Sequence, residues 1–181
     1  MFGKNSWLGV QLILITVFFL LCVIGLIKSA KNAVKARKDG NKELFKYGII
    51  PAASLFIMLL TWVFNFGIIH FAMLITLVPF IHTAAFLFGN IFVYNYLEDN
   101  TFLKILCLIS SVAYIVFYTF IPDGTGSGYM YACFGLIKNY SFIKCSQYIS
   151  GAGFAVSALC IITQFVTAIK LKKGGKNEKH R

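Results

Sequence analysis

The sequence predicts an all-α, polytopic membrane bundle of five transmembrane helices. One uncharged run extends over 51 residues, from Tyr47 to Leu97. A continuous helix of that length would measure roughly 75 Å, more than twice the ~30 Å hydrocarbon core, so the run must cross a bilayer twice. Three further uncharged runs, at 5–27, 105–122 and 145–169, are each long enough for about one crossing. The composition agrees, because 59% apolar and 13% charged residues are typical of membrane proteins rather than of soluble domains.

The five helices are expected at about 8–28, 47–66, 70–96, 103–121 and 148–170. The first is too long for the apolar core of a secretory signal and is followed by a basic cluster, so it is expected to stay uncleaved. The turn that divides the long run is predicted at Asn65-Phe66-Gly67. Pro79 falls in the middle of the third helix, where the missing N–H predicts a kink.

The chain is interpreted as one transmembrane domain, 1–181, with a basic inner loop (28–46), an outer aromatic, glycine-rich loop (122–147) and a basic tail (170–181). Fourteen of the 17 Lys and Arg residues lie on the side of the inner loop and the tail. Because basic residues concentrate on the cytoplasmic side of membrane proteins, the N-terminus is predicted outside and the C-terminus inside. An odd number of crossings agrees with that orientation.

The inner loop also predicts a lipid contact. Its lysines recur at helical spacing, so the first helix is expected to extend beyond the bilayer until Asp39-Gly40-Asn41 ends it. The expected partners are anionic headgroups at the inner face of the bilayer, although a docking face for an acidic partner or a lipid-gated switch is an alternative. The lysines of this contact are Lys28, Lys31, Lys35, Lys38 and Lys42.

A polar arc on the third helix is the candidate functional site. Its wheel brings Thr76, Pro79, His82, Thr83, Gly89 and Asn90 to one face. One interpretation is packing, with His82 and Asn90 hydrogen-bonded to Gln164, Tyr114 or Thr61 on other helices. The other is a small cavity for a neutral or amphipathic ligand, in which His82 donates or accepts. The residues proposed for this intramembrane polar site are His82, Asn90, Thr83, Thr76, Asn65 and Gln164. A second stripe, which contains Gly153 and Ser157, predicts the face of the fifth helix that meets other helices.

Several chemistries find no support in the residues. No acidic or basic residue lies deep in a predicted span, which disfavours ion-driven mechanisms. His70 and His82 share one helix, so they cannot ligate a haem from two sides. No catalytic residue, metal site, cofactor or nucleic-acid partner is predicted. Cys133 and Cys145 lie in the outer loop and could form a disulfide if that compartment is oxidising.

The functional prediction is a small, non-enzymatic, multi-span membrane protein. We expect a transport-related or accessory subunit that engages a neutral ligand or a partner membrane protein. One alternative is an interaction or immunity-type protein that acts through its helix faces, and another is a membrane-embedded enzyme that uses His82. The protein is expected in the plasma membrane. The short loops and the abundance of Lys, Ile, Phe and Asn favour a bacterial cytoplasmic membrane.

Overall fold

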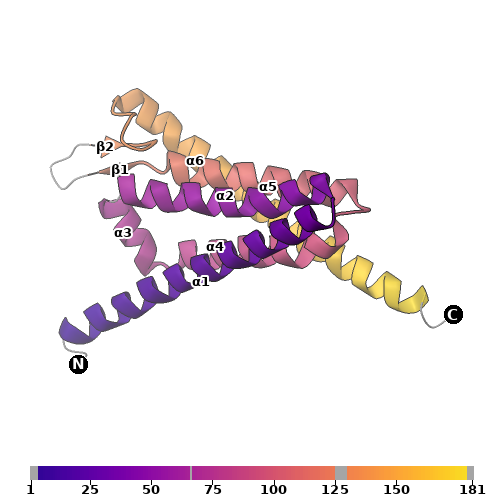
Figure 1. The fold of residues 1–181 in the computed structure, drawn as a ribbon. Coiled ribbons are helices and arrows are strands. Elements are labelled where there is room, and N and C mark those ends of the chain that lie inside the picture. The colour runs from indigo at the N-terminus through magenta and orange to yellow at the C-terminus, as the bar shows by residue number, and fades with distance from the viewer. Residues whose placement is uncertain (1–3, 66, 125–129, 179–181) are drawn as a thin grey trace.

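The computed structural model describes residues 4–65, 67–124 and 130–178, which form a mostly helical bundle. The long helices lie side by side along one axis (Figure 1), with α3 and the two short strands at one end and the C-terminus at the other. The elements are α1 (Lys4–Lys38), α2 (Lys42–Phe64), α3 (Ile68–Ile75), α4 (Val78–Val93), the 3-10 helix η1 (Tyr94–Tyr96), α5 (Thr101–Phe120), β1 (Asp123–Gly124), β2 (Met130–Tyr131) and α6 (Tyr140–Glu178).

Within the described residues, five helical segments are long and apolar enough to cross a membrane. This confirms the predicted all-α bundle with five candidate spans. The segments are Leu12–Lys38, Lys42–Phe64, Val78–Tyr96, Thr101–Phe120 and Tyr140–Lys172.

The prediction of one helix over 70–96 was wrong, because the helix is interrupted at Thr76 and Leu77. The Thr76 hydroxyl donates to the Met73 carbonyl (2.8 Å) and so caps the end of α3. Leu77 then takes a left-handed conformation (φ 61°), which no continuing α-helix allows. Pro79 is therefore not a kink inside a helix but lies in the first turn of α4, where its missing N–H costs little.

One other predicted boundary is confirmed and two differ. α1 ends at Lys38 next to Gly40 (φ 73°), as the Asp39-Gly40-Asn41 sequence predicted. The Asn41 side chain accepts a hydrogen bond from the Leu44 N–H and starts α2 five residues before the predicted 47. α6 begins at Tyr140 rather than 148, so the last part of the predicted outer loop is helix. The remainder contains the β1–β2 pair, in which Asp123 lies opposite Tyr131.

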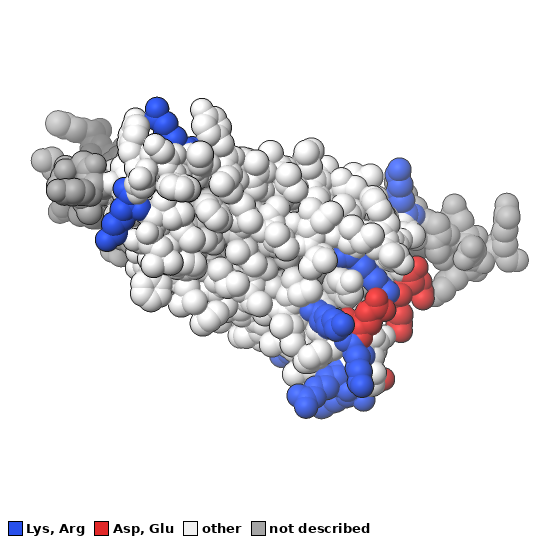
Figure 2. Space-filling model, turned by 90° about the horizontal axis from the view of Figure 1, so that it is seen from above, with Lys and Arg blue, Asp and Glu red and all other residues white. Residues whose placement is uncertain are grey.

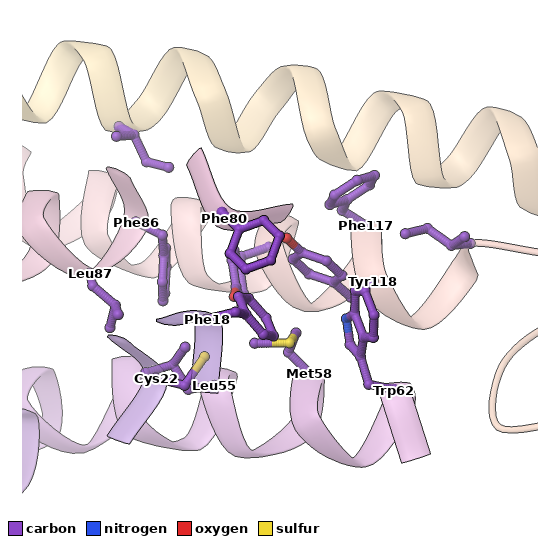
Figure 3. Packing of buried hydrophobic residues seen from close by; sticks show 13 residues of the cluster. Phe18, Cys22, Leu55, Met58, Trp62, Phe80, Phe86, Leu87, Phe117 and Tyr118 are labelled. Atoms are coloured by element: carbon purple, nitrogen blue, oxygen red, sulfur yellow. The ribbon is translucent and has the colours of Figure 1, made fainter. Parts of the chain in front are cut away.

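The core is built from aromatic and aliphatic side chains of α1, α2, α4, α5 and α6 (Figure 3). Phe18 of α1 lies at its centre, with ring centroids 4.9 Å from Phe80 and 5.7 Å from Trp62. Phe86 stacks on Tyr114 at 4.1 Å. A second cluster, which includes Val93, Leu97 and Leu103, fills the bundle where α4 turns into α5.

Charged side chains gather at the ends of the bundle, and the broad band between them is uncharged on the face that Figure 2 shows. We call the end with the α1–α2 and α4–α5 turns and residues 170–178 the basic end, and the opposite end, with α3, β1 and β2, the hairpin end. Two contacts join the turns of the basic end: Lys104 pairs with Glu43 (2.9 Å), and the Asn41 amide donates to Glu98 (3.0 Å).

Candidate functional site

His82 lies on α4 and faces α5 and α6. Its Nε2 and the Ser157 hydroxyl of α6 are 3.0 Å apart and share a hydrogen bond. Only 5% of the His82 residue surface is exposed, and its Nδ1 has no hydrogen-bond partner among the described residues. The imidazole is packed among four aromatic rings with centroid distances of 5.1–5.8 Å: Tyr114, Phe117, Tyr118 and Phe154.

The other polar residues of α4 make hydrogen bonds that do not involve His82. Thr83 shares a hydrogen bond with the Tyr114 hydroxyl (2.9 Å), and the Asn90 amide donates to the Phe86 carbonyl of its own helix (2.8 Å). Gln164 of α6 donates to the Ser110 hydroxyl (3.1 Å) of α5. The bond that His82 makes across helices therefore goes to Ser157 and not to Gln164, Tyr114 or Thr61.

Two residues of the predicted site lie elsewhere. Thr76 is exposed at the end of α3. Asn65 is fully buried at the C-terminal cap of α2, and its amide atoms have no partner among the described residues. His82 and Thr83 are thus neighbours on α4 that bond to different helices, and the structure shows no hydrogen bond between Asn90 and Gln164 among the described residues.

A groove lies beside His82 between α4 and α6. Its volume is about 270 Å³, slightly below the ~300 Å³ at which typical ligand sites begin. Its walls are almost wholly apolar and include small side chains on both helices, Ala85 and Ala158. The full lining is Val78, Ile81, His82, Ala85, Phe154, Ala158, Ile161 and Ile162.

The polar stripe of α6 faces the interior of the bundle. The Ser146 hydroxyl donates to the Phe120 carbonyl (2.6 Å), and the Ser150 hydroxyl donates to the Phe117 carbonyl (3.0 Å). At Gly153 a Cβ would lie 2.9 Å from the Phe117 backbone nitrogen, so only glycine lets α5 and α6 approach this closely. The stripe predicted to meet other helices does so within this chain.

Asp123 and His70 form a buried pair at the hairpin end that sequence reasoning did not find. The Asp123 carboxylate accepts hydrogen bonds from the backbone N–H groups of Ile69 and His70, both at 2.9 Å, and from His70 Nδ1. Neither side chain is exposed. Gly67 makes room for this contact, because a Cβ there would meet the carboxylate and lie 2.8 Å from the Gly124 carbonyl. One sequence signal could have indicated the pair: Asp123 is the sole acidic residue at the predicted outer side.

The pKa values of this pair follow from burial and hydrogen bonding. Burial alone would raise the pKa of Asp123, but the N–H groups of His70, Ile69 and Gly124 outweigh it and hold the pKa below its ordinary value. Burial lowers the pKa of His70, and the hydrogen bond and charge of Asp123 offset only part of that effect. The pair is therefore an ionised carboxylate that accepts from a neutral imidazole at neutral pH.

The remaining predicted residues were located as follows. Cys133 and Cys145 are both free thiols, so the suggested disulfide is not formed in this structure. Cys145 lies on the exposed side of α6, whereas its neighbour Ser146 faces the interior. The Cys145 thiol therefore points away from the bundle. The predicted lipid contacts are all exposed: Lys28, Lys31, Lys35, Lys38 and Lys42. No group of three or more His, Cys, Asp or Glu side chains suited to a metal ion occurs within the described residues.

Comparison with protein-family models, with curated proteins and with solved structures found no match to this chain.

Proposed function

We propose that the chain is a non-enzymatic, multi-span membrane protein that binds a neutral, mainly apolar ligand in the groove between α4 and α6. The bundle carries an uncharged band between two charged ends, which suits insertion into a bilayer. In such a setting the groove is open to the hydrocarbon region, from which an apolar ligand enters without crossing water.

The observation that carries this proposal is the groove beside His82 together with the state of that residue. The walls select an apolar body. Nδ1 of the buried imidazole has no partner among the described residues, and the proposal requires the ring to turn so that Nδ1 bonds to one polar group of the ligand. A buried polar atom without a partner is costly, and a ligand that satisfies it gains that energy.

The test uses a long-chain aliphatic alcohol that carries a photoreactive diazirine, with peptide mapping of the adducts. Labelling is expected on α4 and α6 between Val78 and Ala85 and between Phe154 and Ile162. Ala158→Leu fills the groove and should reduce labelling there several-fold, whereas Ala155→Leu, at an exposed position of the same helix, should not. Equal labelling of both variants would contradict the proposal.

His82 itself is a poorer first target. Its ring fills the space between four aromatic side chains, so His82→Ala would create a cavity and lower stability whatever the function. Ser157→Ala removes one hydrogen bond and leaves the groove lining unchanged. It is therefore a better variant than His82→Ala for testing the His82 contact.

A second candidate function is that of a membrane-embedded hydrolase. The hydrogen bond between Ser157 and His82 Nε2 (3.0 Å) has the geometry of a nucleophile and its general base. Against it, Ser157 is fully buried and Nδ1 has no carboxylate to orient the ring among the described residues. A fluorophosphonate probe decides: an adduct on Ser157 that is lost in Ser157→Ala would favour the hydrolase, and the binding proposal predicts no adduct.

A further inference from the structure

The outer face of α1 carries a groove near the basic end that the proposed ligand site does not use. The volume of this groove is about 510 Å³. Its lining residues recur at intervals of three and four, so they form one stripe along the helix. They are Ile27, Ala30, Lys31, Val34, Lys35 and Lys38.

Apolar and basic side chains share this stripe. Ile27 and Val34 are 51% and 53% exposed, although Ala33 and Ala36 on the other face of α1 are buried. Ala33 is the residue against which Gly48 of α2 packs. The stripe is therefore the side of α1 that the bundle does not cover.

Within the described residues, none of the three lysines of the stripe takes part in a salt bridge. The chain has six acidic residues. Glu43 is paired with Lys104, Glu98 accepts from Asn41, and Asp123 lies at the hairpin end with His70. Among the described residues, no carboxylate lies within salt-bridge distance of Lys31, Lys35 or Lys38.

We propose that this groove binds one anionic phospholipid, with its phosphate held between Lys31, Lys35 and Lys38 and an acyl chain along Ile27, Ala30 and Val34. Lysine stems cover apolar surface and extend their ammonium groups to the headgroup level, where basic clusters beside a span attract anionic lipids. A free phosphate would leave the apolar strip uncovered. The inference rests on the insertion into a bilayer that is proposed above.

Native mass spectrometry of the purified full chain tests the inference, with phosphatidylglycerol as the probe and phosphatidylcholine as the zwitterionic reference. One phosphatidylglycerol should be retained, with at least about tenfold preference over phosphatidylcholine. The triple variant K31Q/K35Q/K38Q should lose at least about tenfold in retention, as expected for three surface lysines near a headgroup. The triple variant K46Q/K138Q/K170Q loses the same net charge at exposed positions outside the groove and should retain the lipid. Equal loss in the two triple variants would overturn the proposal.

Two further arms distinguish the occupant. Ala30→Phe fills the apolar floor and keeps every lysine, so it should weaken phosphatidylglycerol retention several-fold. If glycerol 3-phosphate or poly-glutamate displaces the lipid at equal concentration, the site belongs to a free phosphate or an acidic protein segment, and the proposal fails. Carbonate extraction of membranes reports separately on insertion: an inserted chain without a preference for phosphatidylglycerol contradicts this inference alone, whereas an extractable chain contradicts the proposed function.

Discussion

Asp123 connects more of the hairpin end than any other described side chain there. Its carboxylate accepts from the backbone of α3, from His70 and, at 2.7 Å, from the Gly124 N–H that begins the short hairpin. The carboxylate therefore supplies hydrogen-bond acceptors to the first N–H groups of α3, which have no partner within the helix. This one residue fixes where the chain enters α3 after leaving α2.

Replacing this carboxylate should destabilise the hairpin end. We expect Asp123→Asn to lower the free energy of unfolding by about 2 kcal/mol or more, because a buried, charged acceptor of several N–H groups is lost. The measurement is the melting temperature of the purified chain in detergent. Asp99→Asn, at an exposed turn position, is the matched control and should melt like the parent.

The same pair predicts a pH dependence of stability. The pKa of His70 lies below its ordinary 6.5, and that of Asp123 lies below its ordinary 3.8. Both groups favour their deprotonated forms in the folded chain, so their stabilisation is complete above these ordinary values and is lost as the pH falls through the lowered ones. Melting curves between pH 8 and pH 5 should show falling stability below about pH 6.5, and His70→Gln should flatten this dependence. An unchanged slope in the variant would show that His70 does not titrate as described.

Single residues were partly predictable from the sequence. The exposed lysines of α1 and the inward arc with His82 follow from helical spacing, which local sequence encodes. The Asp123–His70 pair joins residues 53 positions apart, and no local pattern such as helical spacing brings them together. The Ser157 partner of His82 was within the recognised stripe, but the register between α4 and α6 decides which of its members is reached.

At the scale of elements, the contact between α5 and α6 depends on close backbone approach. Gly153→Leu should lower the folded yield and cost at least about 2 kcal/mol, because its side chain would collide with the backbone of Phe117 and the Ala113 carbonyl. Gly151→Leu is the matched control, since nothing lies within 4 Å of its added Cβ. Size-exclusion profiles and melting temperatures of the two variants measure the difference, and equal behaviour would contradict the described packing.

Gly153 is an unsuitable position for testing contacts with a partner protein. A bulky residue at this position would disturb the chain itself, so it cannot report on a surface for a partner protein. The sequence shows that the stripe of α6 is an interface, because small and hydroxyl residues recur along one face. It does not show whether the other side of that interface belongs to the same chain.

The number of long helices was predicted better than their boundaries. Hydropathy locates an apolar run and is insensitive to a break inside it, which is why 70–96 was expected as one helix. The break depends on the left-handed backbone at Leu77, a conformation that leucine seldom adopts and that no sequence rule predicts there. In contrast, Gly40 at the end of α1 is the residue that such a turn requires, and the predicted stop was confirmed.

At the scale of the whole molecule, the arrangement of charge and the number of helices support each other. The α1–α2 turn, the α4–α5 turn and residues 170–178 lie at the basic end, as five antiparallel crossings require (Figure 1). The number of long helices was predictable because three apolar runs each match one bilayer thickness and the run from Tyr47 to Leu97 matches two. The groove beside His82 was not predictable in the same way. It is formed by side chains from two helices, and the sequence does not determine how these helices pack.

The central claim is that these five helices cross a bilayer with the basic end inside, and cysteine accessibility in intact cells tests it most directly. The exposed Cys145 near the hairpin end should react with a membrane-impermeant maleimide added outside, and C145S should lose that label in a C133S background. A cysteine introduced by D99C in the doubly substituted C133S/C145S chain should react only after the cells are permeabilised. Labelling of the D99C variant from outside, or labelling of Cys145 only after permeabilisation, would contradict the account.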